Sequence, residues 1–145
     1  MKFFEYHFHG CAGHKTIELD RGAYEEMSDF LLKKGETDGF LATFSAAPVT
    51  NLVECLNFCR GIMESGNLSG ARLDGVYLEG PFVRQPGAMT ASLLAKPDLD
   101  DAKRLVEAGN GIIRAVALAP ELPGADARYE SPPAHPGRAA RFDSS

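Results

Sequence analysis

Hydrophobic and polar positions along the chain follow two alternating periods, one typical of strands and one typical of helices. Residues 3–9 alternate between aromatic and polar side chains, and Gly10 ends the segment, so a strand is predicted there. Three short apolar runs are typical of buried strands, namely residues 39–44, 73–78 and 112–118. The last run is apolar almost throughout, which predicts a sheet that is covered on both faces.

Segments with apolar residues at helical spacing separate these predicted strands. The first predicted helix covers residues 23–34, with Gly35 as its stop. The second is capped by Thr50 or Asn51 and ends at Met63. The third is opened by Asp98 or Asp100 and ended by Gly109. Because strands and helices alternate, the pattern predicts an α/β fold, a parallel sheet with helical crossovers.

Polar side chains that could carry chemistry all fall at the C-terminal end of a predicted strand: His7, His9, Thr43, Glu79 and Glu121. In folds of alternating strands and helices, the carboxyl ends of the strands are where sites are built. The sequence therefore directs the search for a site to this edge of the sheet.

The composition predicts one folded domain over residues 1–124 and a different kind of segment over residues 125–145. The second segment contains three prolines and lacks Val, Ile, Leu and Met, so it is expected to be a disordered tail. Translation in a wrong reading frame is an alternative origin for it.

Charge and hydropathy exclude several classes of function. The chain has 145 residues, is 44% hydrophobic and carries a net charge of −5 without a cluster of Lys and Arg, which argues against a nucleic-acid surface. No run approaches the roughly 18 to 20 apolar residues of a membrane span, and the charged N-terminus is unlike a secretory signal. A cytoplasmic protein is expected. Its three cysteines, Cys11, Cys55 and Cys59, do not suggest a disulfide framework, and Cys55 and Cys59 are interpreted as core thiols.

A metal site is the leading chemical hypothesis. Side chains two apart on a strand point the same way, so His7 and His9 can offer two imidazoles to one cation, such as zinc. Glu79 directly follows a predicted strand, and a buried carboxylate there must be paired or bind a metal. The alternatives are one packed and one solvated histidine, and a surface glutamate in a turn. Taken together, the three residues favour a shared His-His-Glu site.

Four further polar residues remain open between two interpretations. His14 and Lys15 follow the glycine loop, and Arg84 and Gln85 follow Phe82. Each could contact an anionic group or simply be solvated. His135 lies in the low-complexity tail and is assigned no role.

Several segments together resemble the N-acetylglucosamine-6-phosphate deacetylase family of the amidohydrolase superfamily. They are HFHGCAG at 7–13, TFSAAPVT at 43–50, YLEGPF at 77–82, PGA at 86–88 and VALAPE at 116–121, and the resemblance covers residues 3–124. It implies the N-terminal part of a metal-dependent (β/α)8 barrel, with about four of the eight strands.

The resemblance also implies roles for particular residues. His7, His9 and Glu79 match metal ligands, and Gly87 and Ala88 match a loop that approaches the amino sugar. The implied reaction is hydrolysis of the N-acetyl group of a small amino-sugar phosphate, which gives glucosamine 6-phosphate and acetate. A divalent metal ion, zinc or iron, is the implied cofactor.

Several positions depart from the family pattern. Glu5 stands where an aspartate is usual, His14 and Lys15 replace other residues after the second glycine, and Met89 stands where a histidine often follows Gly-Ala. Two further metal-binding histidines and the catalytic aspartate of the family lie on later strands, so no catalytic residue is expected within this chain. Its deacetylase activity alone is therefore expected to be impaired.

Two alternatives to the deacetylase interpretation stay open. A metal-dependent phosphoesterase of the polymerase-and-histidinol-phosphatase (PHP) type also begins with His-x-His, although residues 16–78 contain no histidine. A non-catalytic half-barrel that self-associates is the other, because open strand edges favour association. A homo-oligomer is expected on the same ground.

Overall fold

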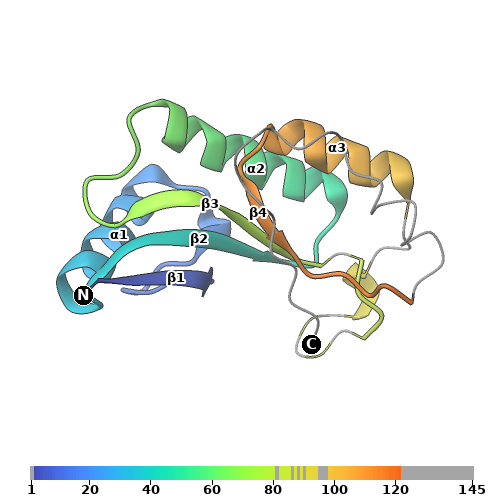
Figure 1. Ribbon diagram of the computed structural model, residues 1–145, viewed down its shortest axis with the longest axis horizontal. Helices are drawn as coiled ribbons and strands as arrows, with labels where there is room; N and C mark the ends of the chain where they lie inside the picture. The colour runs from blue at the N-terminus through green and yellow to red at the C-terminus, as the bar shows by residue number, and fades with distance from the viewer. Residues whose placement is uncertain are drawn as a thin grey trace.

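The computed structural model describes residues 2–80, 82–85, 87, 89, 91–94 and 98–121. Four parallel strands form one sheet in the order of the chain: β1 (Phe3–Phe8), β2 (Thr37–Ser45), β3 (Arg72–Glu79) and β4 (Ile113–Val116). Three helices connect them: α1 (Arg21–Lys34), α2 (Val49–Glu64) and α3 (Leu99–Gly109) (Figure 1). Two short 3-10 turns lie at η1 (Thr16–Glu18) and η2 (Ala91–Leu93). The predicted α/β class and the partial barrel with helical crossovers are confirmed.

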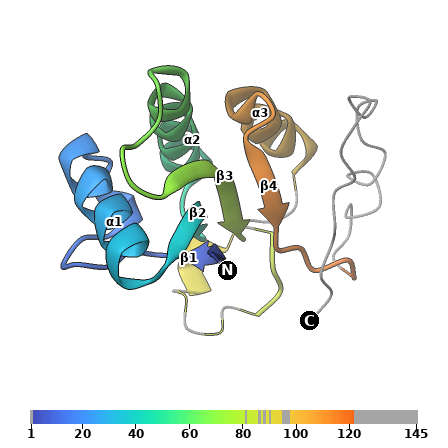
Figure 2. The same ribbon diagram turned by 60° about the vertical axis from the view of Figure 1, so that its left-hand side comes forward.

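All three helices lie along the same side of the sheet (Figure 2). The core fills the space between them, because β2 directs Phe40, Ala42 and Phe44 into a cluster that includes Leu52 and Leu56 of α2. One side of the sheet is thus packed against helices, as in the wall of a barrel.

Cys55 and Cys59 belong to this core, and the interpretation of both as core thiols is confirmed. Burial raises the pKa of Cys55 to about 11 and that of Cys59 to about 12. Both side chains are therefore protonated thiols at neutral pH and behave as small apolar groups.

The starts of the helices are set by local hydrogen bonds. Asp98 accepts from the backbone N–H groups of Asp100 and Asp101, as one of the two predicted caps of α3. Asp20 accepts from the N–H of Ala23 at 2.8 Å, so α1 begins two residues before its predicted start.

The predicted cap of α2 is wrong. The helix begins at Val49, ahead of Thr50 and Asn51, and Pro48 is the residue that precedes its first turn. The carbonyl oxygen of Pro48 accepts from the N–H groups of Asn51 and Leu52. The pyrrolidine ring fixes φ near the value that a helix start needs, so the chain turns into the helix without a side-chain cap.

The prediction that strand 112–118 is covered on both faces is also wrong. β4 has four residues, and three of them are only partly buried while Arg114 is exposed. β4 pairs with β3 alone within the described sheet, so its other edge lacks the neighbour that would bury it. An apolar run indicates that a strand is buried in a complete sheet. It does not indicate which neighbouring strands this part of the chain contains.

The predicted tail, residues 125–145, and Ala88 lie outside the described residues. In the described part of the chain, no helix combines the length and the apolar character that crossing a membrane requires.

Candidate metal centre

His7, His9 and Glu79 converge at the carboxyl ends of β1 and β3. The Nε2 atoms of His7 and His9 lie 3.1 Å apart, the Oε1 of Glu79 lies 3.5 Å from His7 Nε2, and its Oε2 lies 3.2 Å from His9 Nε2. Each of the three residues offers one potential ligand atom, and these three atoms all lie within 4.8 Å of one another. Two nitrogens and a carboxylate thus meet at one point, although His7 and Glu79 are separated by 72 positions in the sequence.

The donor set fits a divalent transition-metal ion. Two imidazoles and a carboxylate are ligands that suit zinc and iron, and the carboxylate supplies a negative charge toward the bound cation. The side chains are 39%, 47% and 27% exposed for His7, His9 and Glu79, so an ion and a further ligand can reach the group from solvent.

A glycine with a positive φ follows His9 after β1, and another follows Glu79 at the end of β3. Gly10 follows His9 with φ +146°, and Gly80 follows Glu79 with φ +105°. A Cβ on Gly10 would overlap the carbonyl oxygen of His14, so the chain can fold back after His9 only without a side chain at this position. The two glycines let the chain leave the sheet directly behind the ligands.

Neighbouring groups contact the candidate ligands. The ring of Tyr77 meets the ring of His7 edge-on, with centroids 5.3 Å apart. Ser45 donates its hydroxyl to Oε2 of Glu79 at 3.3 Å from the end of β2. Glu5 accepts from the backbone N–H of His7 at 3.0 Å, which shows that this glutamate bonds the backbone beside a ligand.

Sequence reasoning missed Ser45 and Tyr77. In the ladder between β2 and β3, Ser45 pairs with Glu79, and Tyr77 pairs with Thr43. Tyr77 and Glu79 are two residues apart on β3 and therefore share a face of the sheet, so the sequence alone could have indicated Tyr77. Ser45 could be found only once the register between β2 and β3 was known.

His14 is held within the chain and does not await an external anion. Its Nδ1 lies 3.1 Å from Oε2 of Glu18, and its Nε2 lies 3.1 Å from Oε2 of Glu26. The hydrogen bonds to these two carboxylates raise the pKa of His14. The imidazole therefore ties the η1 turn to α1.

The remaining predicted residues do not join the three ligands in the described structure. Gly87 is an exposed turn residue with φ +55°, and Arg84 and Gln85 are exposed. Met89 returns to the end of β2, where its sulfur accepts from the N–H of Ala46 at 3.4 Å. The loop after β3 thus comes back to the carboxyl edge of the sheet at residue 89.

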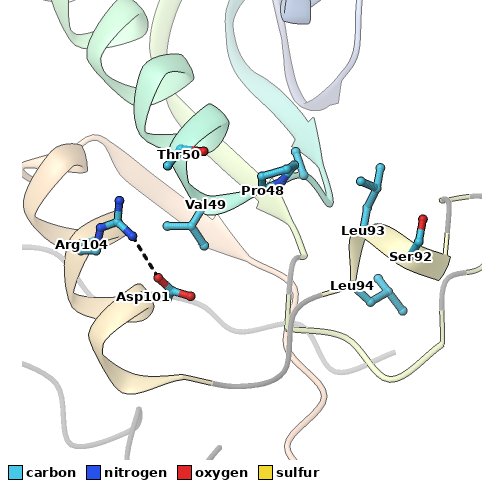
Figure 3. A pocket seen from close by; sticks show the side chains of 9 residues that line it. Pro48, Val49, Thr50, Ser92, Leu93, Leu94, Asp101 and Arg104 are labelled. Atoms are coloured by element: carbon cyan, nitrogen blue, oxygen red, sulfur yellow. Dashed lines mark hydrogen bonds and ion pairs between the residues drawn. The ribbon is translucent and has the colours of Figure 1, made fainter.

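A separate cavity of about 400 Å³ lies beside the first turns of α2 and α3 (Figure 3). Its lining is made of Ala47, Pro48, Val49, Thr50, Ser92, Leu93, Leu94, Asp101 and Arg104. The guanidinium of Arg104 bonds the carboxylate of Asp101 at 3.2 Å, so its charge is compensated inside the cavity wall. None of the three ligands lines this cavity.

No model of a protein family matches this chain. It is 34% identical over 119 residues to the N-acetylglucosamine-6-phosphate deacetylase of Bacillus subtilis, a match that spans 79% of this chain and 30% of the relative. The resemblance to these deacetylases is confirmed.

The similarity extends to a second sugar and to solved structures. The chain is 26% identical over 125 residues to the N-acetylgalactosamine-6-phosphate deacetylase of Escherichia coli O157:H7, covering 85% of this chain and 33% of the relative. Two structures of the N-acetyl-D-glucosamine-6-phosphate deacetylase from Mycobacterium smegmatis, one of them a mutant in complex with N-acetyl-D-glucosamine-6-phosphate, match with a TM-score of 0.73. Their identities are 26% and 25%, and they cover 87% of this chain and 35% and 32% of those chains.

The chain spans about a third of the length of the curated relatives that it matches. The similarity therefore concerns one part of the deacetylase fold, the part that contains the four described strands. None of these similarities favours the phosphoesterase alternative.

Proposed function

We propose that the chain is the portion of an amino-sugar-phosphate deacetylase that holds a divalent cation with His7, His9 and Glu79. The observation that carries the proposal is the convergence of these three side chains at the strand ends, in a chain that is similar to a deacetylase over 119 residues. The proposed substrate is an N-acetylated amino-sugar phosphate, and the proposed products are the free amino sugar phosphate and acetate. Zinc and iron are the proposed metals.

Each side chain of the centre has a distinct part in this proposal. When bound, a divalent cation supplies Lewis-acid activation of an amide carbonyl and of water. His7 and His9 contribute neutral nitrogens, Glu79 contributes charge, and Ser45 holds one carboxylate oxygen of Glu79 in place. Gly87 and Ala88 are proposed to approach the amino sugar, as the family resemblance implies.

The centre is proposed to be one half of a complete site. In the family that the chain resembles, the aspartate that moves the proton belongs to a later barrel strand, and the four described strands provide no counterpart. We therefore expect the 145-residue chain alone to release acetate poorly. Robust acetate release that a chelator abolishes would contradict this expectation.

A chimera tests the proposed function directly. Residues 3–121 would replace the matched segment of the Bacillus subtilis relative, and acetate release from N-acetylglucosamine 6-phosphate and N-acetylgalactosamine 6-phosphate would be measured. The chimera is expected to deacetylate at least one of the two sugars, and Glu79→Gln is expected to abolish the reaction. A folded, metal-loaded chimera without activity on either sugar would overturn the proposal.

Cytoplasm is the proposed location and a homo-oligomer the proposed state. The three cysteines are free thiols, which suits a reducing compartment.

A further inference from the structure

The backbone between His7 and His9 is not held by a regular strand ladder. The pairing of β1 with β2 shifts register between Glu5 and Phe8. At this shift the N–H of Phe8 donates to the side-chain Oγ1 of Thr43, at 2.8 Å. A hydroxyl oxygen thus takes the place of a backbone carbonyl at the peptide that joins the two proposed ligands.

A second buried hydroxyl holds the other end of this segment. The carbonyl oxygen of His9 accepts from the backbone N–H of Thr16 at 2.9 Å, and Thr16 Oγ1 lies 3.3 Å from it. The same Oγ1 donates to the carbonyl of Thr43 at 2.9 Å, its shorter contact. Thr16 therefore links the backbone of one ligand to the residue that holds Phe8.

Both threonines lie deep in the molecule. Thr16 is 2% exposed and Thr43 is 1% exposed, and Tyr24 donates its hydroxyl to the carbonyl of Thr16 at 2.9 Å. The small network crosses three parts of the chain, namely the end of β1, the η1 turn and the carboxyl-terminal part of β2. Buried hydroxyls must be paired. The hydroxyl of Thr43 accepts from the N–H of Phe8 and lies 3.5 Å from the carbonyl of Leu41, while the hydroxyl of Thr16 donates to the carbonyl of Thr43.

We propose that Thr43 and Thr16 are positioning residues of the metal centre. This inference rests on the proposed function, because it concerns how the same three ligands are held. The hydroxyl of Thr43 fixes the N–H of Phe8. The backbone N–H of Thr16 fixes the carbonyl of His9, and the hydroxyl of Thr16 ties this residue to the carbonyl of Thr43. Together these bonds set the direction in which both imidazoles leave the strand. The Nε2 atoms are thereby brought to 3.1 Å from each other and into reach of Glu79.

Valine is the informative replacement because it keeps the shape of threonine and removes the hydroxyl. Thr43→Val leaves the N–H of Phe8 without its acceptor, so the peptide must rotate or the strand must slide toward a regular register. Thr16→Val removes the link to the carbonyl of Thr43. Serine keeps the hydroxyl in each case and is the rescue variant.

The test measures zinc affinity of the full chain by competition with a chromophoric chelator. Thr43→Val and Thr16→Val are each expected to weaken zinc binding by about 10- to 100-fold, the range typical of partners that orient metal ligands. Thr43→Ser and Thr16→Ser are expected to stay within about threefold of the wild type, well inside that range. Thermal melts of the metal-free proteins establish that each variant is folded.

Ser28→Ala is the matched control. Ser28 is a buried hydroxyl on α1 that donates to the carbonyl of Ala71 and accepts from the N–H of Gly70, away from the ligands. Its removal is expected to lower the melting temperature and to leave zinc affinity unchanged. This comparison separates loss of stability from loss of ligand geometry.

The outcomes distinguish the positioning role of the two threonines from the metal centre itself. Valine variants that fold and bind zinc as tightly as the wild type would overturn the positioning role alone, and so would folded serine variants that fail to retain affinity. A wild-type chain whose zinc affinity equals that of His9→Ala would overturn the metal centre itself, and with it this inference. The positioning role is upheld when the valine variants alone lose affinity.

Discussion

The carboxylate of Glu79 serves two imidazoles at once. Its Oε1 faces His7, while its Oε2 faces His9 and accepts from Ser45. Replacing this carboxylate by an amide keeps the shape of the side chain and removes the charge. The single change therefore isolates what the negative oxygen contributes to holding a cation.

Glu79→Gln is expected to weaken zinc binding by more than the roughly 100-fold upper range of residues that act from outside the ligand set. The metal-free protein should keep its melting temperature within a few degrees, because partly exposed polar contacts of this kind contribute only about 0–1 kcal/mol. Calorimetric zinc titrations and melts check both. Glu25→Gln, which removes a similarly exposed carboxylate that bonds Ser69, is the control and should bind zinc normally. Equal affinities of the two variants would contradict the account.

The cysteines give an independent prediction about the core. Burial raises the pKa of Cys55 to about 11 and of Cys59 to about 12, and it raises the pKa of the partly exposed Cys11 less far. Iodoacetamide at pH 8 should therefore label Cys11 first and leave the other two intact until the protein unfolds, because the thiolate is the reactive form. Peptide mass spectrometry reads the order. Rapid labelling of Cys55 or Cys59 in the folded chain would contradict the packing described here.

At the scale of single residues, the sequence predicted the convergence of His7, His9 and Glu79 better than the contacts that surround them. The spacing of His7 and His9 and the position of Glu79 at a strand end were readable because strand parity is local. Ser45 and Thr16 act across 34 and 27 positions of sequence, on Glu79 and on Thr43. Such contacts depend on strand register, which no local pattern specifies.

Among the elements, the η1 turn and α1 are joined by His14. The imidazole bonds Glu18 on the turn and Glu26 on the helix, with Lys15 and Asp20 as the other charged neighbours on the turn. The hydrogen bonds to the two carboxylates raise the pKa of His14 above its ordinary value of 6.5. The hydrogen bond from His14, followed by one from the backbone of Lys15, lowers the pKa of Glu18 below 4.5.

These shifts define a pH window for the connection. The contribution of His14 to stability is fully present below pH 6.5 and is lost as the pH rises through its raised pKa. The contribution of Glu18 is present above pH 4.5 and is lost as the pH falls through its lowered pKa. The difference in melting temperature between the wild type and His14→Gln should therefore be larger at pH 5.5 than at pH 8.5. An equal difference at both values would show that the charged imidazole does not hold the turn.

The order and type of the elements could be predicted, while several of their limits could not. Alternating strand and helix periods gave four strands and three helices in the observed order. The start of α2 was missed because Pro48 precedes its first turn without the side-chain cap that marks many helix starts. β4 was predicted three residues too long, because its apolar sequence suits burial that the described sheet does not provide.

Considered as a whole, the described sheet has two open edges. β1 and β4 each pair with one neighbour, and β1 exposes Phe3, Phe4 and Tyr6. A second copy related by a twofold axis along the strands could place β4 of one chain beside β1 of the other, which would keep every strand parallel and complete eight strands. A second copy is therefore the occupant that we propose for these edges.

Light scattering coupled to size exclusion tests this proposal. The wild type is expected to elute with twice the mass of the 15.6 kDa chain. Tyr6→Lys places a charge on the β1 edge and should shift the mass to that of a monomer, since charged edges oppose strand pairing. Phe30→Lys makes the same kind of change at an exposed aromatic residue of α1 and should leave the dimer intact. A monomeric wild type would reject the second copy as occupant.

The most direct test of the metal centre is X-ray absorption spectroscopy of the zinc-loaded chain. The account predicts one zinc ion per chain, surrounded by nitrogen and oxygen at about 2.0–2.2 Å, with the scattering signature of two imidazoles. Glu79→Gln should lose this spectrum at the same zinc concentration. A zinc–sulfur distance of about 2.3 Å would instead indicate binding by the cysteines, and that result would contradict the assignment of His7, His9 and Glu79 as the ligands.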